Sequence, residues 1–462
     1  MRIEKKALLA VGLGALLLAG IILTRRLHVV SQAPPAEPAP RAQAEAPTPA
    51  SPAPPQDPIP APQAAKGSSL LGDLAQAIHQ GNDPAIRAIL EKLRGILYPP
   101  IPDQENAAIP LLEAFSLTKK LIPRGPERAA YDALLDGKDP SPEQLGKLRA
   151  WFETNAESVD RATRLMREAA DRPRCRFEPG PPSPDDGVVV STTPFTSMQY
   201  ASNLLCVQAV LLKADGRKDE SAENLRALLG LSRAARAEPT LISQMVGSSL
   251  NNGAWEMIQR LGAVDAPRLS ESVAALDPVG FRRDGERALM GEVYGLISTY
   301  MKVKSDSSTV VMDEASRRWL SAPERVPDLA LYVQGISEVV ALGSKSYGEG
   351  KTELDALVLK YGSSSLGFTA AAQGAIPAIP QMLGQLANSE AKADLLRLAL
   401  ELERHRARQG AYPAALEGLQ TTLPSDPFTG QPFAYRREGA GFILEEPGNV
   451  GKATRLSWKS RP

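Results

Sequence analysis

The chain has 462 residues, with 53 Lys plus Arg and 53 Asp plus Glu, so its formal net charge is zero. A balanced charge argues against broad nucleic-acid binding, because that activity needs a basic surface to neutralise phosphates. The length exceeds that of one typical domain, and an apolar content of 43% allows a sizeable core. Ala and Leu dominate and aromatic residues make up only 5%, which favours a mainly α fold.

The first 30 residues predict a membrane anchor. An apolar run at residues 7–23 is flanked on both sides by basic residues. At about 1.5 Å per residue, a helix of this length spans roughly 26 Å, the lower end for a membrane helix. A cleaved signal peptide is the alternative. Arg25 follows the run directly, and Pro34 follows the nearest small-x-small site, so we favour an uncleaved signal-anchor.

Residues 31–66 form a Pro/Ala-rich linker, with 12 prolines and 11 alanines in 36 residues. Such a composition buries too little apolar area to offset the entropy of ordering, which predicts a disordered, semi-rigid spacer. An anchor followed by such a spacer is typical of bacterial envelope proteins. We therefore expect a single-pass protein of the inner membrane with its body in the periplasm. Small residues at 10, 14, 15 and 19 would also permit a homodimer through the anchor.

Residues 67–385 are expected to form a helical domain. Ser141, Pro142 and Glu143 give a helix N-terminus signal, and apolar residues then recur at helical spacing to about residue 170. The other expected helices cover residues 200–213, 219–236, 241–261, 279–303, 324–342, 353–359 and 390–409. Two helices joined by the turn at residues 214–217 predict an αα-hairpin, either in an irregular bundle or in a repeat array.

Two segments of this body are expected to be non-helical. Residues 188–190 are three consecutive valines that suggest a short strand. Residues 361–379 are rich in Gly, Ser and Ala and lack long side chains, so we interpret them as a flexible lead-in to the C-terminal region.

Residues 386–462 predict a small α+β module. A helix at residues 390–409 carries an apolar stripe and ends at Gly410. Pro424, Pro427 and Pro432 exclude a helix in the next stretch. Alternating apolar residues at 433–435 and 442–444 then predict two antiparallel strands, and residues 456–458 a third.

Two stretches resemble known families. Residues 213–247 resemble a segment that recurs in bacterial membrane-anchored helical envelope proteins, a family that carries no activity to transfer. Residues Gly410, Tyr412 and Pro413, followed by Leu423-Pro424 and Asp426-Pro427-Phe428, resemble the helix-plus-β region of type II secretion major pseudopilins. This second resemblance covers about 70 residues and implies a small sheet packed on a helix.

The sequence departs from the pseudopilin pattern in two ways. The helix is internal and charged, whereas a pseudopilin helix lies at the N-terminus. Residues 449–462 contain neither Asp nor Glu, so the calcium loop of that family is missing. Such a helix cannot enter a pilus as a membrane-extracted subunit, so the resemblance implies an accessory place in a secretion or pilus-like system.

The ionisable residues give no metal or catalytic motif. His28, His79 and His405 lack the spacing of a metal site, and we expect His405 to pack or to cap the helix C-terminus. Cys175 and Cys206 form no Cys-x-x-Cys, and Cys206 lies in an apolar run that predicts a buried thiol. Whether the two cysteines pair is left open.

Three short polar patterns have ordinary explanations. Ser116 and Lys119 match Ser-x-x-Lys, but the companion Lys-Thr-Gly is missing. Asp185 and Asp186 could bind a cation, although a solvated turn is the simpler interpretation. Arg436 and Arg437 could hold an anion, although basic residues also protect exposed strand edges.

Taken together, these patterns predict a non-enzymatic scaffold or interaction protein of the cell envelope, with no catalytic residue, cofactor or metal assigned. Its expected partners are the inner membrane, through residues 7–23, and other envelope proteins. Two alternatives stay open: an accessory component of a type II secretion or pilus-like system, and a hydrolase whose site has no linear motif.

Overall fold

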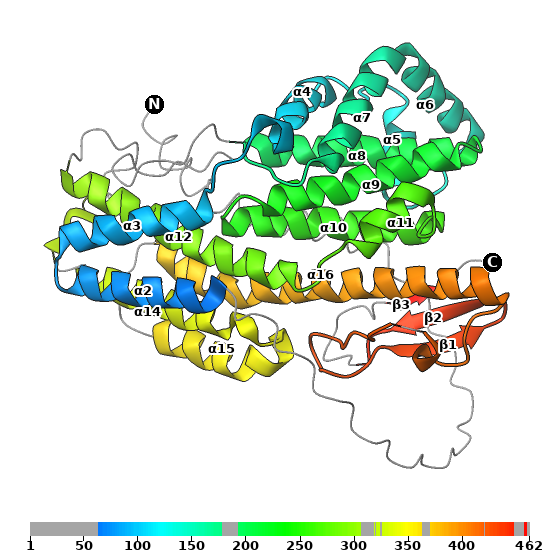
Figure 1. Ribbon diagram of the computed structural model, residues 1–462. Coiled ribbons are helices and arrows are strands. Elements are labelled where there is room, and N and C mark those ends of the chain that lie inside the picture. The colour runs from blue at the N-terminus through cyan, green and yellow to red at the C-terminus, as the bar shows by residue number, and fades with distance from the viewer. Residues whose placement is uncertain are drawn as a thin grey trace, which may run out of the picture.

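The computed structural model describes residues 63–177, 193–305, 318, 320–323, 326–362, 370–419, 421–447 and 457–459. The protein is mainly α-helical, with a small antiparallel sheet near its C-terminus (Figure 1). The expected anchor, residues 31–62 of the expected linker and residues 188–190 lie outside the described residues. The expected boundary of the linker at residue 66 was wrong, because residues 63–66 form the first turn of the helix that begins at Gln63. Among the helices that the structure describes, none has the length and hydropathy of a membrane span.

The helices fall into three groups along the chain. The first comprises α2 (Gln63–His79), α3 (Asp83–Leu97), α4 (Ala108–Thr118), α5 (Arg128–Leu135), α6 (Pro142–Thr154) and α7 (Ala156–Asp171). The second comprises α8 (Thr193–Ala214), α9 (Lys218–Arg236), α10 (Leu241–Leu261), α11 (Pro267–Ala274) and α12 (Gly280–Ser305). The third comprises α14 (Val326–Ala341), α15 (Tyr347–Gly362) and α16 (Ala370–Gln409).

Short 3-10 turns and three strands complete the description. The turns are Asp103–Glu105, Leu342–Ser344 and Leu416–Gly418. Strand β1 (Ala434–Glu438) pairs with β2 (Gly441–Glu445), and β2 pairs with β3 (Ser457–Lys459), both antiparallel. The expected pair of strands is confirmed, but the expected alternation is wrong for β2, where Phe442, Ile443 and Leu444 are all buried because both faces of this central strand are covered. Gly439 turns the chain between β1 and β2 at φ +57°.

Helix α16 crosses the whole molecule and belongs to two hydrophobic cores (Figure 1). Ile379, Met382 and Leu386 pack in a core with α2, α3, α12 and α14. Further along, Leu395 and Leu402 pack in a second core with α8, α9, α10 and the sheet. A smaller cluster joins α5, α6 and α8. The expected division at residues 385/386 therefore falls inside one continuous helix.

Two expectations about the helices were wrong. Residues 143–170 were expected as one helix, but Asn155 ends α6 and begins α7, and its side-chain amide donates to the carbonyl of Trp151 at 2.8 Å. Residues 361–379 were expected to be flexible, but α15 extends to Gly362 and α16 begins at Ala370. Alanine has the highest helix propensity, and α16 continues through Pro377 and Pro380.

Other local predictions are confirmed. Ser141 forms a capping box with Gln144 at the start of α6. Gly216, at φ +79°, turns the chain between α8 and α9, which pack side by side as the expected αα-hairpin. Gly410 ends α16 at φ +76°, and its N–H donates to the carbonyl of Arg406 at 2.8 Å.

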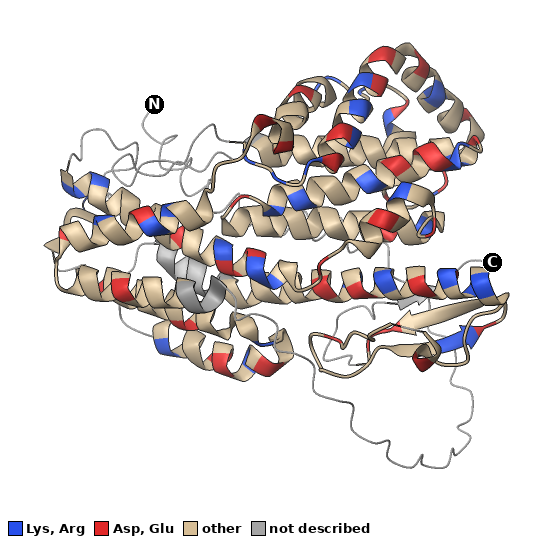
Figure 2. Ribbon diagram, viewed as in Figure 1, with Lys and Arg blue, Asp and Glu red and all other residues tan. Residues whose placement is uncertain are grey.

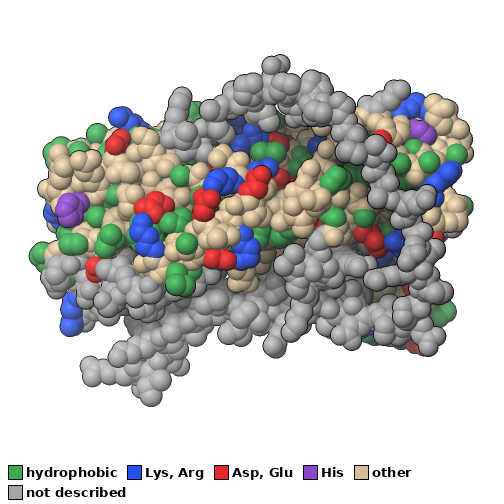
Figure 3. All heavy atoms as spheres, turned by 90° about the horizontal axis from the view of Figure 1, so that it is seen from below, with side chains coloured by type: hydrophobic (Ala, Val, Ile, Leu, Met, Phe, Trp, Pro, Cys, Tyr) green, Lys and Arg blue, Asp and Glu red, His purple; other side chains and the backbone are tan. Residues whose placement is uncertain are grey.

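The visible surface matches the balanced composition. Basic residues alternate with acidic residues along the C-terminal half of α16 (Figure 2). On the face seen in Figure 3, Lys and Arg side chains adjoin Asp and Glu side chains, with hydrophobic side chains scattered between them. Such mixed charge provides solubility without a strong field of one sign.

The packing of α12 against the start of α10 depends on Gly291. A Cβ at this position would lie 1.8 Å from the carbonyl oxygen of Pro239, a backbone atom that cannot move aside cheaply. Gly253, inside α10, has nothing within 4 Å of its would-be Cβ. The two glycines therefore form a matched pair for testing the helix packing.

We expect Gly291→Ala to lower the melting temperature by several degrees, because overpacking typically costs about 1–3 kcal/mol. Gly253→Ala should keep or raise it, since alanine is about 0.5–1 kcal/mol better than glycine inside a helix. Thermal unfolding followed by circular dichroism measures both. Equal melting temperatures for the two variants would contradict the close approach of α12 and Pro239.

Candidate functional site: a groove between α12, α15 and α16

One face of α12 presents charged side chains beside residues of the hydrophobic core. Arg282, Glu286 and Leu289 lie at i, i+4 and i+7, so they share a face of the helix. The adjacent Met290 and Val293 are fully buried in the core. A charged residue on an otherwise apolar helix face requires a special environment, because burial of an unpaired charge is costly.

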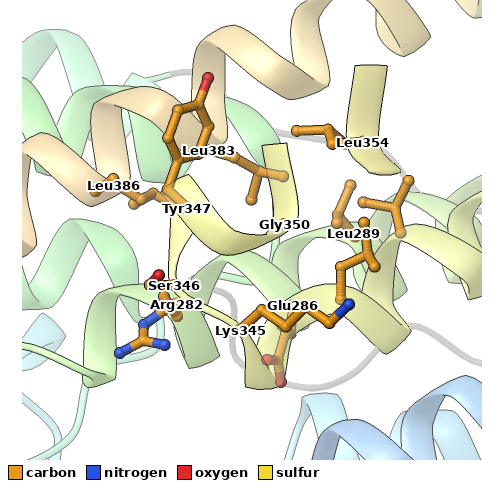
Figure 4. A pocket seen from close by; sticks show the side chains of 14 residues that line it. Arg282, Glu286, Leu289, Lys345, Ser346, Tyr347, Gly350, Leu354, Leu383 and Leu386 are labelled. Atoms are coloured by element: carbon orange, nitrogen blue, oxygen red, sulfur yellow. The ribbon is translucent and has the colours of Figure 1, made fainter. Parts of the chain in front are cut away.

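That environment is a groove closed by α12, α15, α16 and the turn Leu342–Ser344. Its lining residues are Arg282, Glu286, Leu289, Val339, Leu342, Gly343, Lys345, Ser346, Tyr347, Gly350, Leu354, Leu383, Leu386 and Ala387. Arg282, Glu286, Lys345 and Ser346 gather at one end, and the leucines form the rest of the wall (Figure 4).

Glu286 is the buried acid of the groove, with 6% of its surface exposed. Desolvation raises the pKa of its carboxyl group to about 7, against the opposing effect of Arg282 and Arg283. The carboxyl group lies against Gly343, where a Cβ would come within 1.9 Å of Oε1. Near neutral pH this side chain therefore occurs in both protonation states, so it can donate or accept a hydrogen bond at the groove.

Arg282 links the groove to α16. Its Nη2 donates to Oε1 of Glu390 at 2.8 Å, and both side chains are largely buried. Arg282 Nε and Glu390 Oε2 have no hydrogen-bond partner within the described part of the chain. Desolvation raises the pKa of Glu390 despite this pairing. The ion pair thus fixes α12 against α16 but leaves one donor and one acceptor unsatisfied.

The start of α15 forms the rim of the groove, and two sets of side-chain interactions stabilise it. Ser346 and Glu349 form reciprocal bonds, in which the N–H of Ser346 donates to Oε2 of Glu349 at 2.8 Å. Lys345 Nζ lies 2.5 Å from Oε1 of Glu353. Because the Ser346 hydroxyl accepts from the N–H of Glu349, it serves as a helix cap.

The Pro-rich stretch after α16 supports the same rim. The N–H of Gly348 donates to the carbonyl of Pro427 at 2.9 Å, and the ring of Tyr347 meets that of Phe428 with centroids 5.4 Å apart. Asp426 is 1% exposed and accepts from the hydroxyl of Thr429 at 2.6 Å. The Asp-Pro-Phe segment that resembles a pseudopilin motif therefore holds α15 in place.

The chemistry of this arrangement suits binding. The leucines offer an apolar wall, and the polar end combines Glu286 with Arg282 and Lys345. The carboxylate partners of these two cations, Glu390 and Glu353, do not belong to the lining. The lining contains neither His nor Cys. Among the described residues, no group of His, Cys, Asp and Glu side chains could hold a metal ion.

The histidines and cysteines stand apart from the groove. The Nδ1–H of His405 donates to the carbonyl of Ala411 at 3.0 Å, at the C-terminal end of α16 as expected. His79 ends α2, and His28 lies outside the described residues. Cys175 and Cys206 are free and buried, and desolvation raises the pKa of both thiols, that of Cys206 to about 12.

The other polar patterns also lie elsewhere. The Ser116 hydroxyl donates to the carbonyl of Glu113 at 2.7 Å on the exposed side of α4. Arg436 pairs with Glu445 at 3.1 Å on β1, the edge strand of the described sheet, and Arg437 is exposed on the same strand. Asp185 and Asp186 lie outside the described residues.

Sequence reasoning missed the groove, although one signal was present. Glu286 precedes Met290 and Val293 by four and seven residues, so an acid sits on an apolar stripe of α12. The other walls come from residues more than 50 positions away, and no local pattern brings them together. No protein-family model, curated protein or solved structure significantly matches this chain.

The raised pKa of Glu286 predicts a pH-dependent stability. A carboxyl group with a folded-state pKa above its unfolded value stabilises at low pH and loses that contribution as pH rises toward about 7. We expect the melting temperature of Glu286→Gln, relative to the wild type, to rise by a few degrees between pH 5 and pH 8. Differential scanning fluorimetry at both pH values measures this.

Glu349→Gln is the control, because hydrogen bonds from Ser346 lower the pKa of Glu349. A lowered folded-state pKa adds stability that is lost only as the solution becomes acidic, so the difference between this variant and the wild type should stay nearly constant between pH 5 and pH 8. If the melting-temperature difference between Glu286→Gln and the wild type were also the same at pH 5 and pH 8, Glu286 would not be desolvated.

Proposed function

We propose that this chain is a non-enzymatic binding protein of the bacterial envelope, anchored in the inner membrane by residues 7–23 with its body in the periplasm. The groove between α12, α15 and α16 binds an apolar segment of a partner protein. The observation that supports this proposal is the lining of the groove, which combines an apolar wall with a polar end that contains basic and acidic side chains.

The polar end favours a peptide over a lipid. Arg282 pairs with Glu390 and Lys345 pairs with Glu353, so each of these cations already has a carboxylate partner. An anionic lipid head group would compete with those carboxylates, whereas a peptide backbone offers N–H and C=O groups to both signs. The leucine wall of the groove can cover one apolar side chain of such a peptide. Burial of one such side chain contributes about 1.5–3 kcal/mol.

A secretion or pilus-like role is the second proposal, supported by the way the sheet packs on α16. The ring of Tyr412 meets that of Phe442 with centroids 4.9 Å apart, and the hydroxyl of Tyr435 donates to the carbonyl of Pro413 at 2.8 Å. These residues belong to the stretch that resembles a pseudopilin. The identity of the bound partner distinguishes this role from a general scaffold.

The hydrolase alternative has weaker support. The one serine that lines the groove, Ser346, uses its hydroxyl to cap α15. The buried acid Glu286 therefore has no described nucleophile to activate in the groove, and binding accounts for the lining better than hydrolysis does.

The groove proposal is tested by photocrosslinking in native membranes. Lys345→p-benzoylphenylalanine places a photoreactive group at the rim, and we expect a discrete protein adduct. Adding Gly350→Leu should weaken the adduct roughly tenfold or more, since its side chain fills the groove and displaces a buried apolar group. A Cβ at Gly350 meets Lys345 and Leu342 only at 3.8 and 3.9 Å, so the fold should tolerate it.

Two controls accompany this experiment. Gly350→Ala adds a Cβ without filling the groove and should retain the adduct. The same photoreactive residue at exposed Lys138, after α5, should give no such adduct. An adduct that survives Gly350→Leu, or that also forms from position 138, would contradict the groove as the binding site.

The anchor is tested by fractionation of cells that express the full chain. We expect the protein in the membrane pellet after alkaline carbonate washing, because an apolar helix of this length remains in the bilayer. Deletion of residues 1–30 should move the body to the soluble fraction. A full-length chain found in the soluble fraction would remove the anchor from the proposal.

A further inference from the structure

A second cavity lies on another side of the start of α12, between α9, α10 and α11. Its lining is rich in arginine. Arg226, Arg233, Arg236 and Arg283 line it, against Asp277 and Asp284. Phe281 and Leu276 add an apolar wall. The groove of the proposed binding function uses other residues of α12, so the two sites are independent.

Three of the four arginines have carboxylate partners. Arg283 pairs with Asp277, and Arg236 pairs with Asp284. Arg226 lies 2.6 Å from Asp171 and 2.9 Å from Glu223, and both acids also pair with Arg268. Within the described residues, these charges balance one another.

Arg233 differs from the other three arginines. Its Nη2 donates to the carbonyls of Ala170 at 2.8 Å and Arg172 at 3.0 Å, and no ion pair with a carboxylate is formed in the described part of the structure. Desolvation and the neighbouring charges of Arg236 and Arg226 lower the pKa of its guanidinium. The side chain nevertheless remains exposed to the solvent in the cavity. One positive charge is therefore left for a ligand.

Two further donors of the cavity lack acceptors. The Nε of Arg236 and the amide nitrogen of Asn251 are buried without a hydrogen-bond partner among the described residues. Asn251 is 2% exposed and comes from α10, whereas Arg236 comes from α9. A buried donor without an acceptor costs about 1–3 kcal/mol, and an acceptor-rich ligand removes this cost.

We propose that this cavity binds a soluble phosphorylated small molecule, with its phosphate group against Arg233, Arg236 and Asn251. Phosphate presents three terminal oxygens to donors from three side chains, whereas a carboxylate presents only two in one plane. Guanidinium groups match phosphate in geometry and charge. The apolar wall of Phe281 and Leu276 would contact the remainder of the molecule.

Isothermal titration calorimetry of the full-length protein with inorganic phosphate at low ionic strength tests this inference. We expect saturable binding at one site, and weaker or no binding of acetate. Arg233→Gln should weaken phosphate binding roughly tenfold or more, because charged hydrogen bonds are the strongest of the set. Because this variant also loses the hydrogen bonds to the carbonyls of Ala170 and Arg172, its melting temperature is measured beside its binding.

Two variants make the result specific. Asn251→Asp keeps the shape of the side chain but places a carboxylate among the donors, so it should abolish phosphate binding. Arg436→Gln removes an exposed arginine on β1 and should bind phosphate as the wild type does. The proposal would be overturned if titration of the wild type with phosphate gave no saturable heat of binding. Unchanged phosphate binding in Arg233→Gln and Asn251→Asp would overturn it as well.

Two more measurements separate the possible sources of the phosphate group. Acetate binding as tight as phosphate binding would overturn the assignment of a phosphate. The calorimetry above uses the full-length chain in detergent. The same chain reconstituted in vesicles of neutral lipid should bind inorganic phosphate with the same affinity. If phosphatidic acid in those vesicles instead abolishes the heat of phosphate binding, the ligand is a lipid head group. The assignment of a soluble phosphorylated molecule would then be wrong.

Discussion

The packing of α16 in two hydrophobic cores is the constraint on which the rest of the structure depends. Its first half contributes Ile379, Met382 and Leu386 to the core around α12 and α14, and its second half contributes Leu395 and Leu402 to the core of α8–α10 and the sheet. A helix in isolation is marginal in water, so this burial is what stabilises it. Packing in both cores therefore fixes the orientation of α16. The groove and the sheet each form against a different part of this helix.

This arrangement also explains why charged side chains occur inside the molecule. Lys392 is 5% exposed, donates to Oδ1 of Asn252 at 2.9 Å and lies 4.8 Å from the centre of the Trp255 ring. Desolvation lowers the pKa of Lys392 to about 8 and raises that of Asp394 to about 7. A helix buried on several sides has little surface left for its polar residues, so they pair with the neighbouring helices.

Much of the C-terminal region could be predicted from the sequence, because its signals are local. Gly410, the apolar residues Phe442 and Leu444, and the prolines after residue 423 each act within a few residues. The N-terminal half of α16 could not, since the Gly, Ser and Ala residues of 361–379 suggest a flexible segment, whereas Ile379, Met382 and Leu386 pack in the core. The groove and the arginine cavity depend on distances between segments far apart in the chain. Glu286 and Arg233 look like ordinary charges of surface helices until their neighbours are known.

Native-state hydrogen exchange along α16 tests the central claim that one helix joins the two cores. The account predicts that amides on both sides of residue 386, and those of β2, share the slow exchange of the core helices α10 and α12, because they open together. Fast exchange of residues 390–445, with residues 379–386 still protected, would contradict it. The helix would then open in two parts, and the sheet would be a separate unit that does not hold the rim of the groove.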